Sequence, residues 1–259
     1  MKFERYTVLV SEFDLHDPEN DELGLGGGEI REVWVTEAGL RDRASGPSVL
    51  FRHPETRAVV AEQWFVRGLL HRDGGPAEIV QSDNSVTEVW RRQGKMHRDD
   101  GPAYIFRDTR PPGHKLIEQW YQDGLSHRED GPAIIHRVDD SRENFRYLGR
   151  LQSEAWCRFG KWHREGGPAE VSYKYPTGEL VGESWYVEGQ LHRLDGPASI
   201  SYDGKTGRAH LFEYFVNGKL HRTDGPARVR FDVDTGKVVE AEYYVGGLPT
   251  KPSPGPSPT

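Results

Sequence analysis

The sequence predicts an all-β protein: an elongated antiparallel β-meander, or solenoid, of about seven two-stranded repeats followed by a disordered C-terminal tail. Three observations predict this class. One segment recurs along the chain at spacings of 26 to 36 residues, which is typical of a repeat architecture. The composition, with 30 glycines, 17 prolines and 11% aromatic residues, favours short strands joined by tight turns. Finally, no stretch shows convincing helical periodicity.

The first repeated element is a connector that reads KLHRTDGPARV at residues 219–229. An eroded copy keeps Arg43 and the Gly46-Pro47 pair but has Asp42 at the histidine position. A catalytic site gathers unlike residues around one substrate, so near-equal copies indicate a structural connector instead. The histidines are His71, His97, His127, His163, His192 and His221, and the arginines that follow them are Arg72, Arg98, Arg128, Arg164, Arg193 and Arg222.

The second repeated element is a glutamate two residues before a large ring. Alternation along such a segment places Glu62 and Trp64 on one face of a strand. The segment after Gly-Pro also alternates, with Ile200 and Tyr202 on one face and Ser201 on the other. Two strands per unit follow, joined at the far end by hairpin loops such as YDGKTGRAH. The glutamates are Glu62, Glu88, Glu118, Glu154, Glu183 and Glu213, and the tryptophans are Trp64, Trp90, Trp120, Trp156 and Trp185.

We expect these repeated residues to serve the fold. The connector aspartate can accept backbone N–H groups in the turn. The arginine can bind a carboxylate through two N–H groups, with the strand glutamate as its natural partner. The imidazole can bond to backbone while it packs on the neighbouring tryptophan. Binding of one ligand per unit, or catalysis, is the alternative for the same residues.

We expect no metal ion and no cofactor. Successive connector histidines would lie about 10 Å apart if each unit adds two strands, which is too far for one zinc ion. The sequence has no H-x-x-x-H or C-x-x-C spacing, and GLGGGE at residues 24–29 lacks the context of a phosphate loop. Binding is predicted instead at exposed second rings on the face opposite the glutamates and tryptophans: Phe65, Tyr121, Tyr186, Tyr214 and Tyr243.

We expect three parts: a capping strand and acidic, glycine-rich connector over residues 1–30, the array over 31–248, and a disordered Pro/Ser-rich tail over 249–259. The insertion at 138–150 is predicted to be a longer loop, although a two-domain split is compatible with it. The net charge of −7 argues against nucleic acid. The single cysteine, Cys157, fits a reducing compartment and is predicted to be buried. Without a membrane-spanning run we expect a cytoplasmic protein that does not insert into membranes.

The W-Y-x-x-G pattern in small, two-stranded, turn-rich units resembles MORN-type repeats, in the variant of bacterial YwqK-like proteins. The resemblance covers about residues 30–248, and the His-Arg-x-Asp connector is additional to the ordinary MORN unit. It implies a non-enzymatic scaffold with a protein partner. The alternatives are an antitoxin or immunity protein whose acidic surface covers a basic toxin, and a small-molecule binder or enzyme that uses one specialised repeat. A homodimer through the terminal strands is also compatible with the pattern.

Overall fold

The computed structural model describes residues 7–12, 30–43, 45–111, 113–138 and 148–251. Every regular element in these ranges is a β-strand. The chain divides into two compact units, residues 1–125 and 126–259. The division falls inside the predicted array, ahead of the insertion at 138–150.

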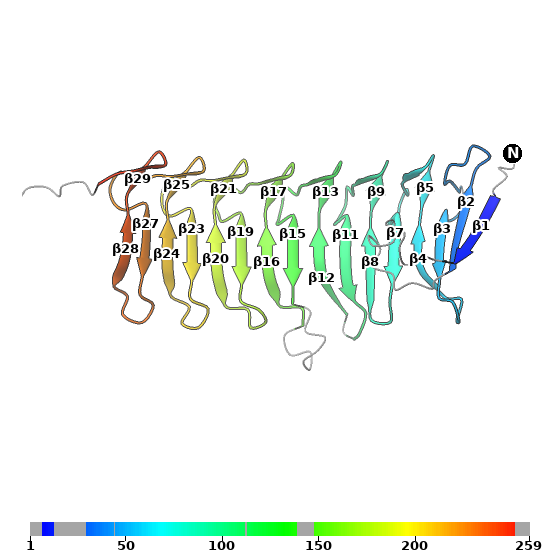
Figure 1. Cartoon of the computed structure of the whole chain (residues 1–259), viewed down its shortest axis with the longest axis horizontal. Helices are drawn as coiled ribbons and strands as arrows, with labels where there is room; N and C mark the ends of the chain where they lie inside the picture. The colour runs from blue at the N-terminus through cyan, green and yellow to red at the C-terminus, as the bar shows by residue number, and fades with distance from the viewer. Residues whose placement is uncertain (1–6, 13–29, 44, 112, 139–147, 252–259) are drawn as a thin grey trace, which may run out of the picture. The chain divides into compact units, whose positions relative to one another are not determined.

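The first unit, residues 1–125, is an antiparallel sheet in which strands adjacent in sequence are adjacent in space (Figure 1). Each neighbouring pair of long strands is antiparallel, so the predicted meander is confirmed here. The long strands, in sheet order, are β1 (Thr7–Glu12), β2 (Ile30–Val35), β3 (Val49–Arg52), β4 (Val59–Gln63), β7 (Glu78–Gln81), β8 (Ser85–Val89), β11 (Tyr104–Asp108) and β12 (His114–Gln119).

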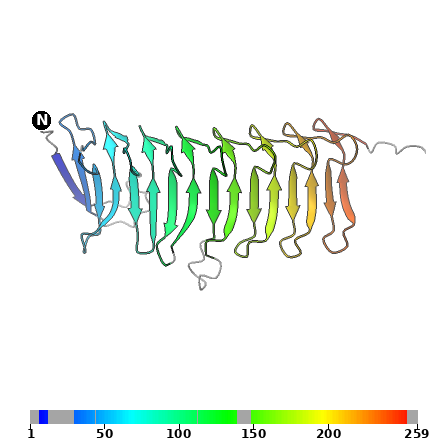
Figure 2. The ribbon, with the colours of Figure 1, turned by 180° about the vertical axis from the view of Figure 1, so that it is seen from behind.

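The second unit, residues 126–259, repeats the arrangement, and its strand order is equally sequential (Figure 2). All its neighbouring long strands are antiparallel. The predicted hairpin loops are confirmed, because residues 203–208 and 232–237 each join two paired strands. The long strands, in sheet order, are β15 (Ile134–Arg137), β16 (Leu151–Ala155), β19 (Glu170–Tyr173), β20 (Leu180–Ser184), β23 (Ser199–Tyr202), β24 (Ala209–Glu213), β27 (Arg228–Phe231) and β28 (Val238–Glu242).

Each connector begins with a short hairpin, which the repeat pattern does not predict. The turn between β25 and β26 has Asn217 at φ 50° and Gly218 at φ 72°, the left-handed pair that defines a type I′ turn. In each unit these hairpins lie at one end of the long strands, opposite the hairpin loops (Figure 1). The short strands are β5 (Phe65–Val66), β6 (Leu69–Leu70), β9 (Arg91–Arg92), β10 (Lys95–Met96), β13 (Tyr121–Gln122), β14 (Leu125–Ser126), β17 (Cys157–Arg158), β18 (Lys161–Trp162), β21 (Tyr186–Val187), β22 (Gln190–Leu191), β25 (Phe215–Val216), β26 (Lys219–Leu220), β29 (Tyr244–Val245) and β30 (Leu248–Pro249).

Large and small residues alternate across each sheet at the level of the tryptophans. The Trp185 N–H donates to the Ala198 carbonyl at 2.7 Å, so an indole and a methyl group stand on neighbouring strands. Strands are about 4.8 Å apart, which leaves no room for two adjacent indoles side by side. The alanine of Gly-Pro-Ala is therefore fixed by packing. These alanines are all 0% exposed: Ala77, Ala103, Ala133, Ala169, Ala198 and Ala227.

The face opposite the tryptophans differs between the units. In the first unit it carries an apolar cluster that includes Phe51 and Phe65. Val60 packs against this cluster, although strict alternation would place it on the same face as Glu62. The reason is a β-bulge: Arg52 pairs with Val59 and Phe51 with Ala61, which leaves Val60 as the extra residue. In the second unit small residues occupy the paired positions on this face: Ser153, Ser172, Gly182 and Ser201.

The predicted ends are described only in part. Strand β1 confirms a strand-like opening, whereas the acidic, glycine-rich connector at 13–29 lies outside the described residues. Most of the insertion, residues 139–147, and the tail from residue 252 onward also lie outside them. The last described strand, β30, ends at Pro249, one residue past the predicted end of the array.

Candidate functional site

Six connector arginines each place the guanidinium over the ring that opens their own repeat. The guanidinium also donates from Nη1 to the carbonyl of the Gly-Pro proline, at 3.3 Å from Arg193 to Pro197. A cation over an aromatic face is attracted by the quadrupole of the ring. The distances from Cζ to the ring centroid are 4.2 Å for Arg43 on Trp34, 3.8 Å for Arg72 on Trp64, 3.9 Å for Arg98 on Trp90, 3.9 Å for Arg164 on Trp156, 4.2 Å for Arg193 on Trp185 and 4.1 Å for Arg222 on Tyr214.

In four connectors the carboxylate partner of this arginine is the aspartate two residues later. Nε of Arg193 donates to Asp195 at 2.9 Å, and the bond lowers the pKa of that carboxyl. The predicted partner, the strand glutamate, is near a connector arginine at Arg72, which lies 3.6 Å from Glu62. Elsewhere strand glutamates bind arginines of the sheet, as in the 2.8 Å pair of Arg107 and Glu88. The same aspartate bond occurs in Arg98–Asp100, Arg128–Asp130 and Arg222–Asp224.

The glycine of the Gly-Pro pair is fixed by the stacked arginine. A Cβ on Gly196 would lie 3.0 Å from Cζ of Arg193, and one on Gly131 would lie 2.7 Å from Cζ of Arg128. The guanidinium cannot move away freely, because the ring, the aspartate and the proline carbonyl hold it. This glycine is therefore required by a close contact and not by a positive φ, which the backbone here does not adopt.

The connector histidine joins its repeat to the next one. Its Nδ1 accepts the backbone N–H of the first turn residue in the following hairpin, which confirms the predicted imidazole–backbone bond. The predicted packing on tryptophan is different at His127, whose ring stacks on Phe159 with centroids 4.1 Å apart. The bonds are Gln93 to His71 (3.2 Å), Asp123 to His97 (3.1 Å), Phe159 to His127 (3.4 Å), Glu188 to His163 (3.2 Å), Asn217 to His192 (3.1 Å) and Gly246 to His221 (3.0 Å).

The eroded first copy keeps this link with a different residue. Asp42 stands at the histidine position, and its Oδ2 accepts the N–H of Arg67 at 3.0 Å. Backbone bonds accompany the side-chain bond in the other repeats. The Gly218 N–H donates to the Leu191 carbonyl at 2.9 Å, and the Arg193 N–H donates to the Phe215 carbonyl at 3.1 Å. Neighbouring repeats are thus tied at three points on the hairpin side.

The predicted exposed rings are not exposed. Phe65 is buried at 8% exposure in the apolar cluster, and Tyr121, Tyr186, Tyr214 and Tyr243 are half-buried. Tyr186 contacts the edge of Trp162 in the preceding repeat, with centroids 4.7 Å apart. Phe65, Tyr121 and Tyr186 belong to the short hairpin strands β5, β13 and β21 and not to long strands of the sheet.

Two of these tyrosines belong to the other face. The Tyr214 N–H donates to the Ala227 carbonyl, as Trp185 does to Ala198, so Tyr214 occupies the tryptophan position. Tyr243 does too, since its carbonyl accepts from Thr250 as that of Tyr214 accepts from His221. Glu183 of the earlier repeat pairs with Ile200, whereas Glu213 pairs with the residue before it, Ser199. Glu213 is therefore shifted by one residue relative to Glu183. A shift of one residue moves a side chain to the opposite face of the sheet.

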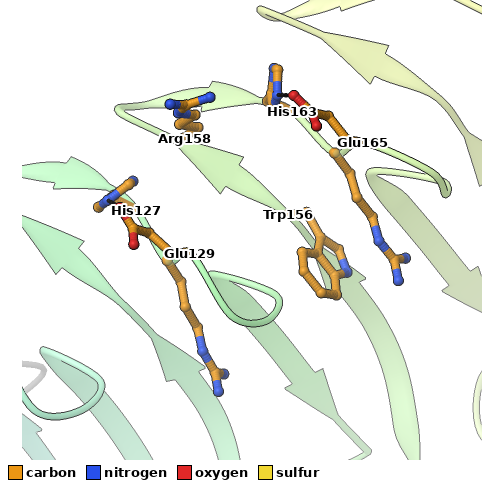
Figure 3. A pocket seen from close by; sticks show the side chains of 8 residues that line it. His127, Glu129, Trp156, Arg158, His163 and Glu165 are labelled. Carbon is orange, nitrogen blue, oxygen red and sulfur yellow. Dashed lines mark ion pairs between the residues drawn. The ribbon is translucent and has the colours of Figure 1, made fainter.

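Grooves open between successive connectors. The larger one has a volume of about 560 Å³ and lies between two connectors of the second unit, with Trp156 below them (Figure 3). An equivalent groove of about 500 Å³ lies between the connectors that contain Arg193 and Arg222, over Tyr214. The larger groove is lined by His127, Arg128, Glu129, Trp156, Arg158, His163, Arg164 and Glu165.

The sequence matches no protein-family model and no curated protein. Function is therefore inferred from the geometry of the chain.

Among the described residues, no three His, Cys, Asp or Glu side chains are placed to hold a metal ion. Within the same ranges, no helix is long and apolar enough to cross a membrane. Cys157 is 2% exposed, as predicted, and burial raises the pKa of its thiol, which opposes formation of the reactive thiolate. The cysteine is therefore a packing residue.

Proposed function

We propose that this protein is a non-enzymatic repeat scaffold that binds a protein partner along its hairpin rim. The hairpin rim is the surface formed by the short hairpins and connectors: residues 36–47, 65–76, 91–102 and 121–125 in the first unit, and 126–132, 157–168, 186–197, 215–226 and 244–250 in the second. The observation that carries the proposal is a contrast between constant contacts inside the repeats and variable side chains outside them.

The constant residues are engaged in holding the fold. The connector arginine binds a ring and a proline carbonyl, and the connector histidine binds the next hairpin. In Asp195 and its counterparts the carboxylate is occupied by the arginine of the same connector. A group used in this way in repeat after repeat is not set apart for chemistry on a substrate.

The variable residues point outward. The first residue of each hairpin turn is exposed and differs in every repeat. The residue two positions after the histidine is also exposed, and it is aspartate, glutamate, leucine or threonine. A constant frame with changing exposed residues is the arrangement by which repeat proteins build extended binding surfaces. The turn residues are Arg67, Gln93, Asp123, Phe159, Glu188 and Asn217, and the connector residues are Asp73, Asp99, Glu129, Glu165, Leu194 and Thr223.

The hairpin rim also carries exposed apolar side chains. In the second unit Leu194 is 81% exposed and Phe159 is 57% exposed. Recurring exposed hydrophobic residues mark interaction surfaces better than scattered ones do. The resemblance to MORN-type repeats supports the same role. Further exposed members on the rim are Leu40, Val66, Leu69, Val187, Val245 and Leu248.

Site-specific photo-crosslinking in the native host tests the proposal. A photoreactive amino acid replaces Val187 on the hairpin rim, and in a matched variant it replaces Lys205 in the hairpin loop at the other end of the strands. We expect Val187 to crosslink one defined protein, identified by mass spectrometry, that also binds the purified chain. Capture of the same protein equally from Lys205, or no protein-specific product from Val187, would contradict the proposal.

The identity of the partner separates the scaffold from the antitoxin alternative. The chain has a net charge of −7, which suits a basic toxin. A small basic protein whose toxicity the chain suppresses would assign it as an immunity protein or antitoxin. A partner without such toxicity would support the general scaffold.

A further inference from the structure

We propose that the larger groove, between the connectors at 126–133 and 161–169, binds a carboxylate from an acidic segment of the partner protein. The binding groups are the guanidinium groups of Arg164 and Arg158, which line the groove together with Trp156. The inference rests on the proposed function and deepens it, because it names the chemistry of one contact on the hairpin rim.

Arg164 is held in place before any ligand binds. Its Cζ lies 3.9 Å from the centroid of the Trp156 ring, and its Nη1 donates to the Pro168 carbonyl at 3.0 Å. Gly167 closes the other side, since a Cβ there would lie 3.0 Å from Cζ of Arg164. A fixed guanidinium loses little conformational entropy on binding a carboxylate, which favours affinity.

The carboxylate that such an arginine binds elsewhere is missing in this repeat. In the repeat of Arg193, Nε donates to Asp195, and the corresponding residue after Arg164 is Gly166. Among the described residues, no carboxylate lies within ion-pair distance of Arg164. The Nε–H side of this guanidinium therefore offers the position that an internal aspartate fills in four other repeats: Asp100, Asp130, Asp195 and Asp224.

Arg158 adds a second cation to the same groove. It is exposed on β17 and lines the groove, but it forms no ion pair with a described residue. The corresponding residue of the equivalent groove is Val216. In the first unit Arg92 occupies this position, and Asp99 of the same repeat neutralises it. An unpaired guanidinium at this position is therefore particular to Arg158.

Each of the two glutamates that line the groove lies beside the histidine ring of its own connector. Oε1 of Glu129 lies 4.0 Å from Nε2 of His127, and Oε1 of Glu165 lies 4.0 Å from Nε2 of His163 (Figure 3). In the equivalent groove both arginines, Arg193 and Arg222, are bound to aspartates of their own connectors. The larger groove is thus the one with arginine donors left for an external carboxylate.

The ligand is more consistent with a peptide segment than with a small free anion. The groove is open, and its lining residue Arg158 is followed in the chain by Phe159, which is 57% exposed. An acidic segment can place carboxylates at Arg164 and at Arg158, and an apolar side chain against Phe159. Inorganic phosphate has the charge but cannot make the second contact.

The test uses the full chain and a fluorescein-labelled hexaglutamate peptide, with hexaglutamine as the neutral control. Fluorescence polarisation gives affinity, and NMR of arginine Nε–H groups locates the site. Gly166→Asp supplies the internal carboxylate, and Arg158→Val copies the equivalent groove. Each change is expected to weaken hexaglutamate binding about tenfold, the value of one charged hydrogen bond. Arg92→Val, whose guanidinium is already paired, is the matched control and is expected to leave affinity unchanged.

Several results would overturn the inference: no saturable binding of hexaglutamate, equal binding of hexaglutamine, or wild-type affinity in both Gly166→Asp and Arg158→Val. Inorganic phosphate that displaces the peptide at equal concentration would overturn the choice of a peptide carboxylate. Gly166 has φ +74°, so its variant is checked by NMR for an unchanged fold, and Arg158→Val tests the site independently. If the groove does not bind the peptide, crosslinking from Val187 is still expected. If the proposed function is wrong, that crosslink is absent while hexaglutamate still binds.

Discussion

The backbone N–H of Gly246 donates a hydrogen bond to Nδ1 of His221 at 3.0 Å, across the boundary between two repeats. The bond requires an unprotonated Nδ1, so the neutral ring carries its proton on Nε2. Asp42 makes the corresponding bond to Arg67 with a carboxylate oxygen. This position of the connector therefore requires a hydrogen-bond acceptor for the backbone N–H of the next hairpin. Histidine and aspartate both supply one.

Replacement of His221 tests this requirement. His221→Ala is expected to lower the free energy of local opening around Gly246 by about 0.5–1.5 kcal/mol, because the N–H exchanges its acceptor for water. His221→Asp should retain most of the protection, as Asp42 does in the first copy. Hydrogen exchange of the Gly246 N–H by NMR measures both. Equal loss in the two variants would show that the imidazole ring, and not its acceptor, holds the repeats together.

The glycine of Gly-Pro is predicted to be required by the arginine beside it. Gly196→Ala places a Cβ 3.0 Å from Cζ of Arg193 and is expected to destabilise the chain by about 1–3 kcal/mol. In an Arg193→Ala background the same change should cost much less, because the contact is gone. Denaturant unfolding of the four proteins of this cycle gives the coupling energy. A cost that is independent of Arg193 would point to the backbone instead.

Stability should depend on pH in the acid range through the connector aspartates. The hydrogen bond from the Arg193 guanidinium, and then its charge, lower the pKa of Asp195 below its ordinary value. The stabilisation is therefore complete above the pKa of the unfolded carboxyl and is lost as pH falls through the lower folded pKa. NMR titration of the Asp195 carboxyl checks the direction, and Asp195→Asn should flatten the acid limb of the unfolding curve. An Asp195 pKa at or above the ordinary value would refute it.

Alkaline pH is expected to act on Tyr202. Burial and the 2.6 Å hydrogen bond from its hydroxyl to Glu183 raise the pKa of Tyr202 to about 12. The contribution to stability is complete below the pKa of an unfolded tyrosine, about 10, and is lost as pH rises from there towards 12. Ultraviolet titration of the wild type and Tyr202→Phe isolates this phenol. Ionisation of Tyr202 near 10 would mean that the bond to Glu183 does not form.

The periodicity of the sequence predicts the meander well, because its alternating residues and turn signals are local. The hairpin loops after Tyr202 and Phe231, and the shared face of Ile200 and Tyr202, follow from the pattern alone. The short hairpins do not, although Asn217-Gly218 is a type I′ signal. Two-residue strands are too short to show alternation, so the pattern merges them with the connector.

The candidate site was predictable only in part. Repetition predicts a structural connector, but which carboxylate pairs with Arg193 depends on its distance from Asp195 in the folded loop. Tyr214 was assigned to the wrong face because Glu213 is shifted by one residue. The seven-residue spacing from the ring to the histidine, as from Trp185 to His192, gives the correct register. The open position beside Arg164 is visible only in the structure.

The central claim is that a constant frame presents a variable hairpin rim to a protein partner. Val187→Glu and Leu194→Glu alter the rim, and Lys205→Glu alters the opposite end. The most direct measurement is the affinity of the crosslinked partner for these variants, with denaturant unfolding as the control for folding. We predict that the rim substitutions weaken binding at least about tenfold at unchanged stability, and that Lys205→Glu has no effect. Unchanged binding in both rim variants, with a loss in Lys205→Glu, would contradict the account.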